Sequence, residues 1–105
     1  MYRVHIWMRK KEDMSSEDFL EYWLNSHAPI ARDGYAGLKG YVVHVVTGAP
    51  RDAEIPYDGV AELWWDSRDD FKADMGSDAA KAATDDLANF TRTFGLLFVE
   101  SHEVK

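Results

Sequence analysis

Residues 2–9, YRVHIWMR, alternate two kinds of side chain along the chain, and this alternation decides the fold. A repeat of two places successive side chains on opposite faces, which is typical of a β-strand. The mainly apolar face carries Tyr2, Val4, Ile6 and Met8, and the other face carries Arg3, His5, Trp7 and Arg9. The first face suits a core covered by helices, and the second suits a cavity or a subunit interface.

Three further segments have the composition of strands. They are residues 38–47, 59–65 and 96–104, which are rich in β-branched, aromatic and aliphatic side chains. Gly95 precedes the last of them, and residues 48–58 are predicted to form a long loop because they hold two prolines and several charges.

Helices are predicted between these strands. Ser15, Ser67 and Ser77 each stand before a helical segment, where a serine hydroxyl can accept a hydrogen bond from a free backbone N–H. Pro29 is expected to end or bend the first helix, and Gly76 to interrupt the second.

The resulting order is β-α-β-β-α-β, and its economical solution is a four-stranded antiparallel sheet with both helices on one face. We therefore expect one α+β domain of ferredoxin-like fold over residues 1–105. The chain also holds 4 Trp, 5 Tyr and 5 Phe, which are many rings for so small a core. Two copies that close their bare sheet faces together, as a homodimeric α+β barrel, would cover the excess.

Charge and composition exclude several classes of partner. The net charge is −7, from 19 acidic and 12 basic residues, so nucleic acids and anionic membranes are disfavoured as partners. The absence of cysteine excludes disulfides and zinc–thiolate sites, and it fits a cytoplasmic location. The first residues do not resemble a signal peptide, and no run reaches the about 18 apolar residues of a membrane span.

His27 is the first candidate for chemistry. It follows Phe19 and Trp23 at four-residue spacing on one helix stripe, and an imidazole can exchange a proton near neutral pH. The alternative is a histidine that binds the last carbonyls of its helix. Tyr41 could donate a hydrogen bond to a substrate carbonyl, or it could be an ordinary core tyrosine. Phe19 and Trp23 are candidate substrate-binding walls.

Glu62 and Trp64 are the other candidate substrate-binding residues, on the strand predicted at 59–65. A carboxylate in an apolar strand must be paired or protonated, and the alternative for Glu62 is a structural pair with Arg3 or Arg9. His5, His44 and His102 lie on three predicted strands without a metal-binding spacing, so we expect no metal site. No phosphate-binding or dinucleotide-binding motif occurs, and we expect no cofactor.

Several separated motifs resemble those of EthD-like proteins. FLEYW at 19–23 followed by SHAP at 26–29 resembles the family signature F-x-x-Y-W…H-A-P. GVAELWWDS at 59–67 and FVESHE at 98–103 are similar to two further segments of the family.

This resemblance implies a dimeric α+β barrel that acts on small, mostly apolar molecules. The loop at 48–57 is similar to that of the family's lactone methylisomerases, whose pocket histidine and tyrosine match His27 and Tyr41. The cysteine of that pocket has no counterpart in this chain.

The residues and the resemblance together imply a cofactor-independent enzyme for a small apolar or aromatic carbonyl compound, and the resemblance implies a catabolic or polyketide-type pathway. His27 would shuttle the proton. The reaction could be that of an isomerase, cyclase, dehydratase, decarboxylase or oxygenase. These reactions belong to the isomerase, lyase and oxidoreductase classes. The alternative is a non-catalytic domain that binds a ligand or haem and supports a partner oxidoreductase. A third reading is an oligomerising domain whose pocket is filled by its own side chains.

Overall fold

A computed structural model describes all residues from 1 to 105. Its elements follow the expected order: β1 (Tyr2–Lys10), α1 (Ser16–Tyr22), η1 (Trp23–His27), α2 (Ala28–Gly34), β2 (Leu38–Val45), η2 (Pro50–Asp52), β3 (Gly59–Trp65), α3 (Arg68–Met75), α4 (Asp78–Leu87) and β4 (Thr91–Val99).

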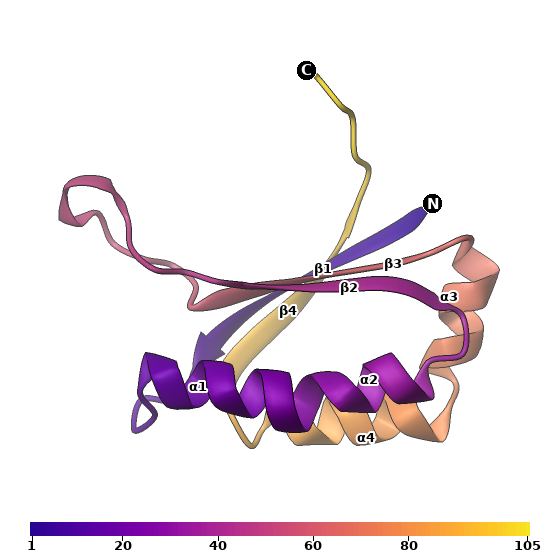
Figure 1. Cartoon of the computed structure of the whole chain (residues 1–105), viewed down its shortest axis with the longest axis horizontal. Coiled ribbons are helices and arrows are strands. Elements are labelled where there is room, and N and C mark those ends of the chain that lie inside the picture. The colour runs from indigo at the N-terminus through magenta and orange to yellow at the C-terminus, as the bar shows by residue number, and fades with distance from the viewer.

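The four strands form one antiparallel sheet in the order β2-β3-β1-β4. All the long helices lie on one side of it, and the other face is bare (Figure 1). The predicted ferredoxin-like α+β fold is therefore confirmed. The principal dimensions of 41 × 37 × 18 Å describe a flat body, from which the β2–β3 loop and the C-terminal residues project (Figure 1).

The core lies between the sheet and the helices. Val4 and Met8 of β1 are each 1% exposed, and β3 contributes the buried side chains of Ala61, Leu63 and Trp65. Phe19, Trp23 and Phe90 are completely buried against them. The alternation seen in residues 2–9 thus separates a core face from a bare face, as expected.

The helices also begin at the serine residues that the sequence predicted as caps. Ser15, Ser67 and Ser77 accept hydrogen bonds from the backbone N–H groups of Asp18, Asp70 and Ala80, at 3.1, 3.2 and 3.2 Å. Each serine has the extended backbone of a helix cap.

Pro29 does not end the first helix, which continues to Gly34. Instead the helix widens over Trp23–His27 into a π-turn, where the N–H of Ala28 bonds to the carbonyl of Trp23, five residues back. A proline has no N–H to continue the regular pattern. The extra residue in the wide turn accommodates this loss within an unbroken helical segment.

The last strand begins earlier than the sequence predicted. β4 runs from Thr91 to Val99, and residues 100–105 form no strand. Gly95 lies inside β4 opposite Trp7, where an added Cβ would meet the indole ring at 2.5 Å. This glycine therefore makes room for a ring across the sheet, and it lies within the strand that it was predicted to precede.

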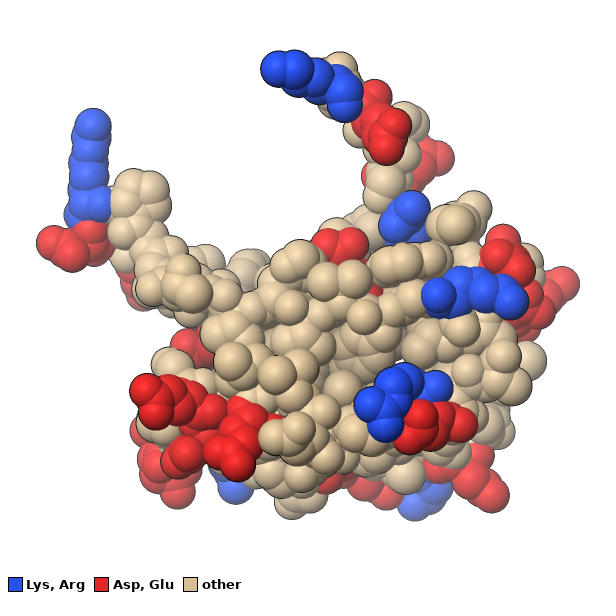
Figure 2. Space-filling view, viewed as in Figure 1, with Lys and Arg blue, Asp and Glu red and all other residues tan.

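Charge is unevenly spread over the surface. Acidic side chains gather at the end of the molecule where α1 lies, and the middle of the same face is mostly uncharged (Figure 2). No helix of the structure is both long enough and apolar enough to cross a lipid bilayer.

Gly59 offers a test of this packing. An added Cβ would meet the six-membered ring of Trp23, which is completely buried and cannot move aside. We expect Gly59→Ala to destabilise the fold by about 1–3 kcal/mol through overpacking, measured by urea unfolding at fixed protein concentration. Gly48→Ala is the matched control, because no atom lies within 4 Å of its added Cβ. Equal unfolding midpoints for the two variants would contradict this packing.

Candidate functional site

A small cavity of about 160 Å³ lies between the sheet and the helices. Hydrophobic residues make up 12 of its 14 lining residues, among them Val4, Leu63, Phe71, Leu87 and Leu96. Its polar groups are His27, Thr84 and the hydroxyls of Tyr35 and Tyr41. The structure thus brings both predicted catalytic residues, His27 and Tyr41, to one apolar space.

His27 ends the π-turn and is 6% exposed. Its Nδ1 lies 2.8 Å from Oδ2 of Asp86, and its ring packs on Phe90 with centroids 4.7 Å apart. A carboxylate can only accept, so Nδ1 carries the hydrogen and Nε2 keeps a free lone pair. The histidine binds a side chain of another helix, and it does not cap its own.

Asp86 of α4 holds His27 in this orientation. Its Oδ1 accepts from the Tyr22 hydroxyl at 2.6 Å and from Nδ2 of Asn89 at 2.9 Å. Burial alone raises the pKa of Asp86, but the hydrogen bonds from Tyr22, Asn89 and His27 together outweigh it, so the pKa lies below its ordinary 3.8. The carboxylate is therefore ionised at neutral pH.

Burial is the main influence on His27 and lowers its pKa below the ordinary 6.5. The hydrogen bond and the charge of Asp86 oppose this effect without cancelling it. At neutral pH the imidazole is consequently uncharged, with a basic Nε2 and an orienting carboxylate behind it. This is the arrangement of a general base.

Tyr41 of β2 supplies a donor. Its hydroxyl oxygen accepts from the indole N–H of Trp23 at 2.9 Å, which leaves its own hydrogen without an acceptor in the chain. Burial raises the pKa of Tyr41 to about 12, so the phenol keeps its proton across the physiological range. A base and a protonated phenol in one apolar cavity can together transfer a proton from a carbon atom that is next to a substrate carbonyl group.

A second carboxylate lies behind another part of the lining. Asp74 is 5% exposed, and its Oδ2 accepts from the indole N–H of Trp65 at 2.7 Å and from the N–H of Gly37 at 3.0 Å. Burial, and then the charge of Asp74, raise the pKa of Tyr35. Tyr35 therefore also stays protonated and faces the cavity as a neutral phenol.

The predicted substrate-binding residues fall into two groups. Phe19 and Trp23 are completely buried and do not line the cavity, although Trp23 positions the Tyr41 hydroxyl. Glu62 and Trp64 point to the bare face of the sheet, away from His27. Within one chain, these two cannot share a site with His27.

Glu62 is paired, but with histidines and not with arginine. Its Oε1 lies 2.7 Å from Nε2 of His44, and its Oε2 lies 4.0 Å from Nε2 of His5. Arg3 instead lies over the Trp64 ring, 5.4 Å from the centroid. No three His, Cys, Asp or Glu side chains in residues 1–105 are arranged to hold a metal ion.

Asp86 and Tyr22 escaped prediction as site residues. The pair at 85–86 has the sequence of a solvated acidic face, and Asp85 does form an exposed pair with Lys81 at 3.2 Å. Asp86 instead turns inward to His27, which is 59 residues away in the sequence. Only the position of Asp86 on the same helix stripe as Ala83, Leu87 and Phe90 hinted at this inward orientation.

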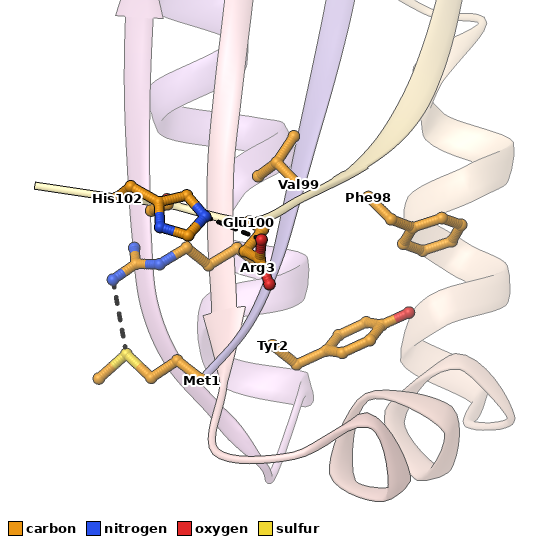
Figure 3. Close-up of a pocket in the computed structure, with 8 residues that line it drawn as sticks. Met1, Tyr2, Arg3, Phe98, Val99, Glu100 and His102 are labelled. Carbon is orange, nitrogen blue, oxygen red and sulfur yellow. Dashed lines mark hydrogen bonds and ion pairs between the residues drawn. The ribbon is translucent and has the colours of Figure 1, made fainter.

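A larger hollow of about 700 Å³ lies beside the first residues of β1 and the end of β4 (Figure 3). Tyr2 and Phe98 form one side with ring centroids 5.9 Å apart, and Arg3, Glu100 and His102 lie around it. Half of its lining residues are polar or charged, and residues 100–105 beside it form no secondary structure. It excludes water poorly, so the smaller His27 cavity is the better candidate site.

Comparison with known proteins assigns the chain to a family and agrees with its fold. The sequence profile of the EthD domain matches residues 11–93. The chain is 33% identical over 88 residues to 4-carboxymethyl-4-methylbutenolide mutase of Pseudomonas reinekei, a match that covers 78% of this chain and 80% of the mutase.

Solved structures share the fold. An ethyl tert-butyl ether d (EthD) family protein from Bacillus halodurans has a TM-score of 0.80 at 24% identity, covering 97% of this chain and 100% of that one. A dimeric ferredoxin-like protein of unknown function from Thermobifida fusca has a TM-score of 0.72 at 19% identity, covering 93% and 88%.

The titration of His27 tests the role of Asp86. Because the carboxylate raises the pKa against the effect of burial, Asp86→Asn is expected to lower the pKa of His27 further. In the unfolded chain His27 has its ordinary pKa of 6.5, which is higher than its pKa in the folded protein. The free energy of unfolding therefore falls as the pH drops from 6.5 to the folded pKa. In the Asp86→Asn variant this fall continues to lower pH. NMR of the histidine Cε1–H measures the shift. Asp85→Asn is the control and should leave it unchanged, whereas a rise in Asp86→Asn would contradict the pairing.

Proposed function

Because this chain belongs to the EthD family, we propose that it is a small enzyme that isomerises a compact carbonyl compound by proton transfer. One observation carries the proposal: a neutral histidine, oriented by a carboxylate, shares an apolar cavity with a protonated tyrosine. The name of the Pseudomonas reinekei mutase, an isomerase-type enzyme for a butenolide, supports this reaction class.

The proposed step moves one proton and needs no cofactor. Nε2 of His27 removes a proton from a carbon activated by the substrate carbonyl, and the electron pair of that C–H bond passes to the carbonyl oxygen. The Tyr41 hydroxyl donates to the resulting enolate oxygen. Nε2–H then returns the proton to another carbon of the conjugated system, and the product has the composition of the substrate.

Asp86 stabilises the charged stage of this cycle. When His27 takes the proton it becomes an imidazolium, and the largely buried carboxylate 2.8 Å away offsets that charge. The Tyr22 and Asn89 hydrogen bonds keep the carboxylate fixed while the charge appears and disappears.

We also propose that the protein works as a homodimer closed over the bare sheet face. That face carries Trp7, Trp64 and Leu97, the last 53% exposed, and these are costly to leave in water. Proteins of the same fold from Thermobifida fusca and Bacteroides fragilis are described as dimeric, which supports the proposal.

Hydrogen exchange tests the proton transfer directly. Incubation of methyl-substituted butenolides in D₂O, followed by ¹H NMR, should show deuterium entering the ring and an isomer accumulating. His27→Gln is expected to slow exchange about 10²–10⁴-fold, because the base is lost. His102→Gln is the matched control, since that exposed histidine lies outside the His27 cavity and pairs with Glu100.

The opposite results are equally informative. Undiminished exchange in His27→Gln would remove His27 from the reaction. Butenolide binding without exchange would instead favour the non-catalytic, ligand-binding alternative, and a Soret band after haem titration would favour its haem-binding form.

A charge on the bare face tests the dimer. Leu97→Asp is expected to shift the protein from dimer to monomer in light-scattering measurements after size exclusion, because a carboxylate would be buried unpaired. Leu24→Asp is the matched control, as this helix residue is 46% exposed on the other side of the molecule. A monomeric wild-type protein, or an unchanged Leu97→Asp dimer, would contradict the proposed interface.

A further inference from the structure

We propose that Tyr35 is a further catalytic residue of the His27 cavity, and that it donates a hydrogen bond to the same substrate oxygen as Tyr41. The two phenols would then form an oxyanion hole for the enolate. This inference rests on the proposed function and adds a residue that no sequence pattern indicated. It follows from the place of Tyr35 in the cavity, from its unused hydrogen and from the packing that fixes its ring.

The Tyr35 hydroxyl is open to the cavity and has no partner in the chain. Tyr35 lines the cavity together with His27 and Tyr41. No fully buried side-chain nitrogen or oxygen lacks a hydrogen-bond partner, so the unpartnered Tyr35 hydroxyl must meet open space. A phenol that keeps its proton offers one O–H donor. A substrate oxygen inside the cavity is an acceptor for it.

The ring of Tyr35 is held in place before a substrate arrives. Tyr35 follows the last residue of α2, and its backbone N–H bonds to the carbonyl of Ala31 at 2.9 Å. Its ring stacks on the buried indole of Trp65, with centroids 6.4 Å apart and 29° between the planes. Asp74 accepts from that indole at 2.7 Å and from the N–H of Gly37, two residues after Tyr35, at 3.0 Å. A donor fixed in advance can stabilise a developing charge without being reordered.

Both phenols keep their protons and belong to one electrostatic site. Burial is the main reason that the pKa of Tyr41 is raised to about 12, the Trp23 hydrogen bond opposes this rise, and the charge of an ionised Tyr35 adds to it. Burial and then the charge of Asp74 raise the pKa of Tyr35 as well. Since the interaction of two charges weakens with distance, an influence of Tyr35 on Tyr41 fits two hydroxyls that serve one ligand.

Two donors suit the oxygen on which the proposed proton transfer places negative charge. A carbonyl oxygen has two lone pairs and can accept from both phenols. When His27 removes the proton, the hydrogen bonds to that oxygen become stronger, because its charge has grown. Tyr35 would therefore stabilise the enolate more than the substrate, which is what lowers a barrier. The positive charge of His27 appears in the same step, so the net charge of the cavity does not change.

Tetronate tests this oxyanion hole without turnover. It is a planar five-membered lactone whose enolate charge is shared with the carbonyl oxygen, and its methyl ether is a neutral counterpart of similar shape. We measure both dissociation constants at pH 7.5 by ¹H–¹⁵N NMR titration and take their ratio as the preference for the anion. Comparison between variants cancels the charges of Asp74 and Asp86, which all variants share.

Tyr35→Phe is expected to lower this preference about tenfold, because a hydrogen bond to a charged oxygen is lost. Tyr41→Phe should have a similar effect. Tyr57→Phe is the matched control and should leave the preference unchanged, since that tyrosine packs on Trp7 outside the cavity. In the D₂O assay, Tyr35→Phe is expected to lower kcat about 10²-fold and to leave KM nearly unchanged.

The other outcomes separate this inference from the proposed function. An unchanged preference for tetronate in Tyr35→Phe, or a rise in KM with full kcat, would overturn the catalytic role of Tyr35. The proposed function would stand in both cases if His27→Gln and Tyr41→Phe still slowed exchange. If neither tetronate nor its ether binds the wild-type protein, the cavity is not the ligand site, and the proposed function fails together with this inference.

Discussion

The carboxylate of Asp86 is the centre on which the site depends. It accepts hydrogen bonds from Tyr22, His27 and Asn89, and so ties the first helical segment to the end of α4. Burial alone would favour a neutral acid at this point, but three donors keep the charge in place. A fixed negative charge next to a buried imidazole then decides which nitrogen carries the hydrogen. The orientation of His27 is in this sense set by a residue that does not line the cavity.

The sheet divides the polar chemistry of the molecule into two parts. On the helix side, carboxylates accept hydrogen bonds from His27 and Trp65 behind the lining of the cavity. On the bare side, Glu62 is flanked by His5 and His44, and the arginines lie over tryptophan rings. The first set is completed by one chain alone. The second set is half exposed and has the mixed polar and aromatic character of surfaces that meet another protein.

The sequence predicted the fold well because strand alternation and serine caps are local signals. It also indicated His27 and Tyr41, since one helix stripe and one strand face lead to the same core. It could not reveal Asp86, whose partner lies 59 residues earlier, or pair Glu62 with His44, which requires the strand register. Gly95 was misread for a similar reason. Its role depends on Trp7 in the neighbouring strand, and no feature of the residues around it records that contact.

The wide turn at Trp23–His27 has a consequence for the angular phase of the whole helical segment. Each residue of an α-helix advances the side-chain direction by about 100°. A single surplus residue therefore rotates the side chains that follow the wide turn relative to those that precede it. Loss of one residue from the wide turn would leave both His27 and Asp86 in the chain and yet turn their side chains away from each other. In related chains, deletion of one residue from this turn is therefore expected to disturb the pairing of the histidine and the carboxylate more than a nearby substitution does.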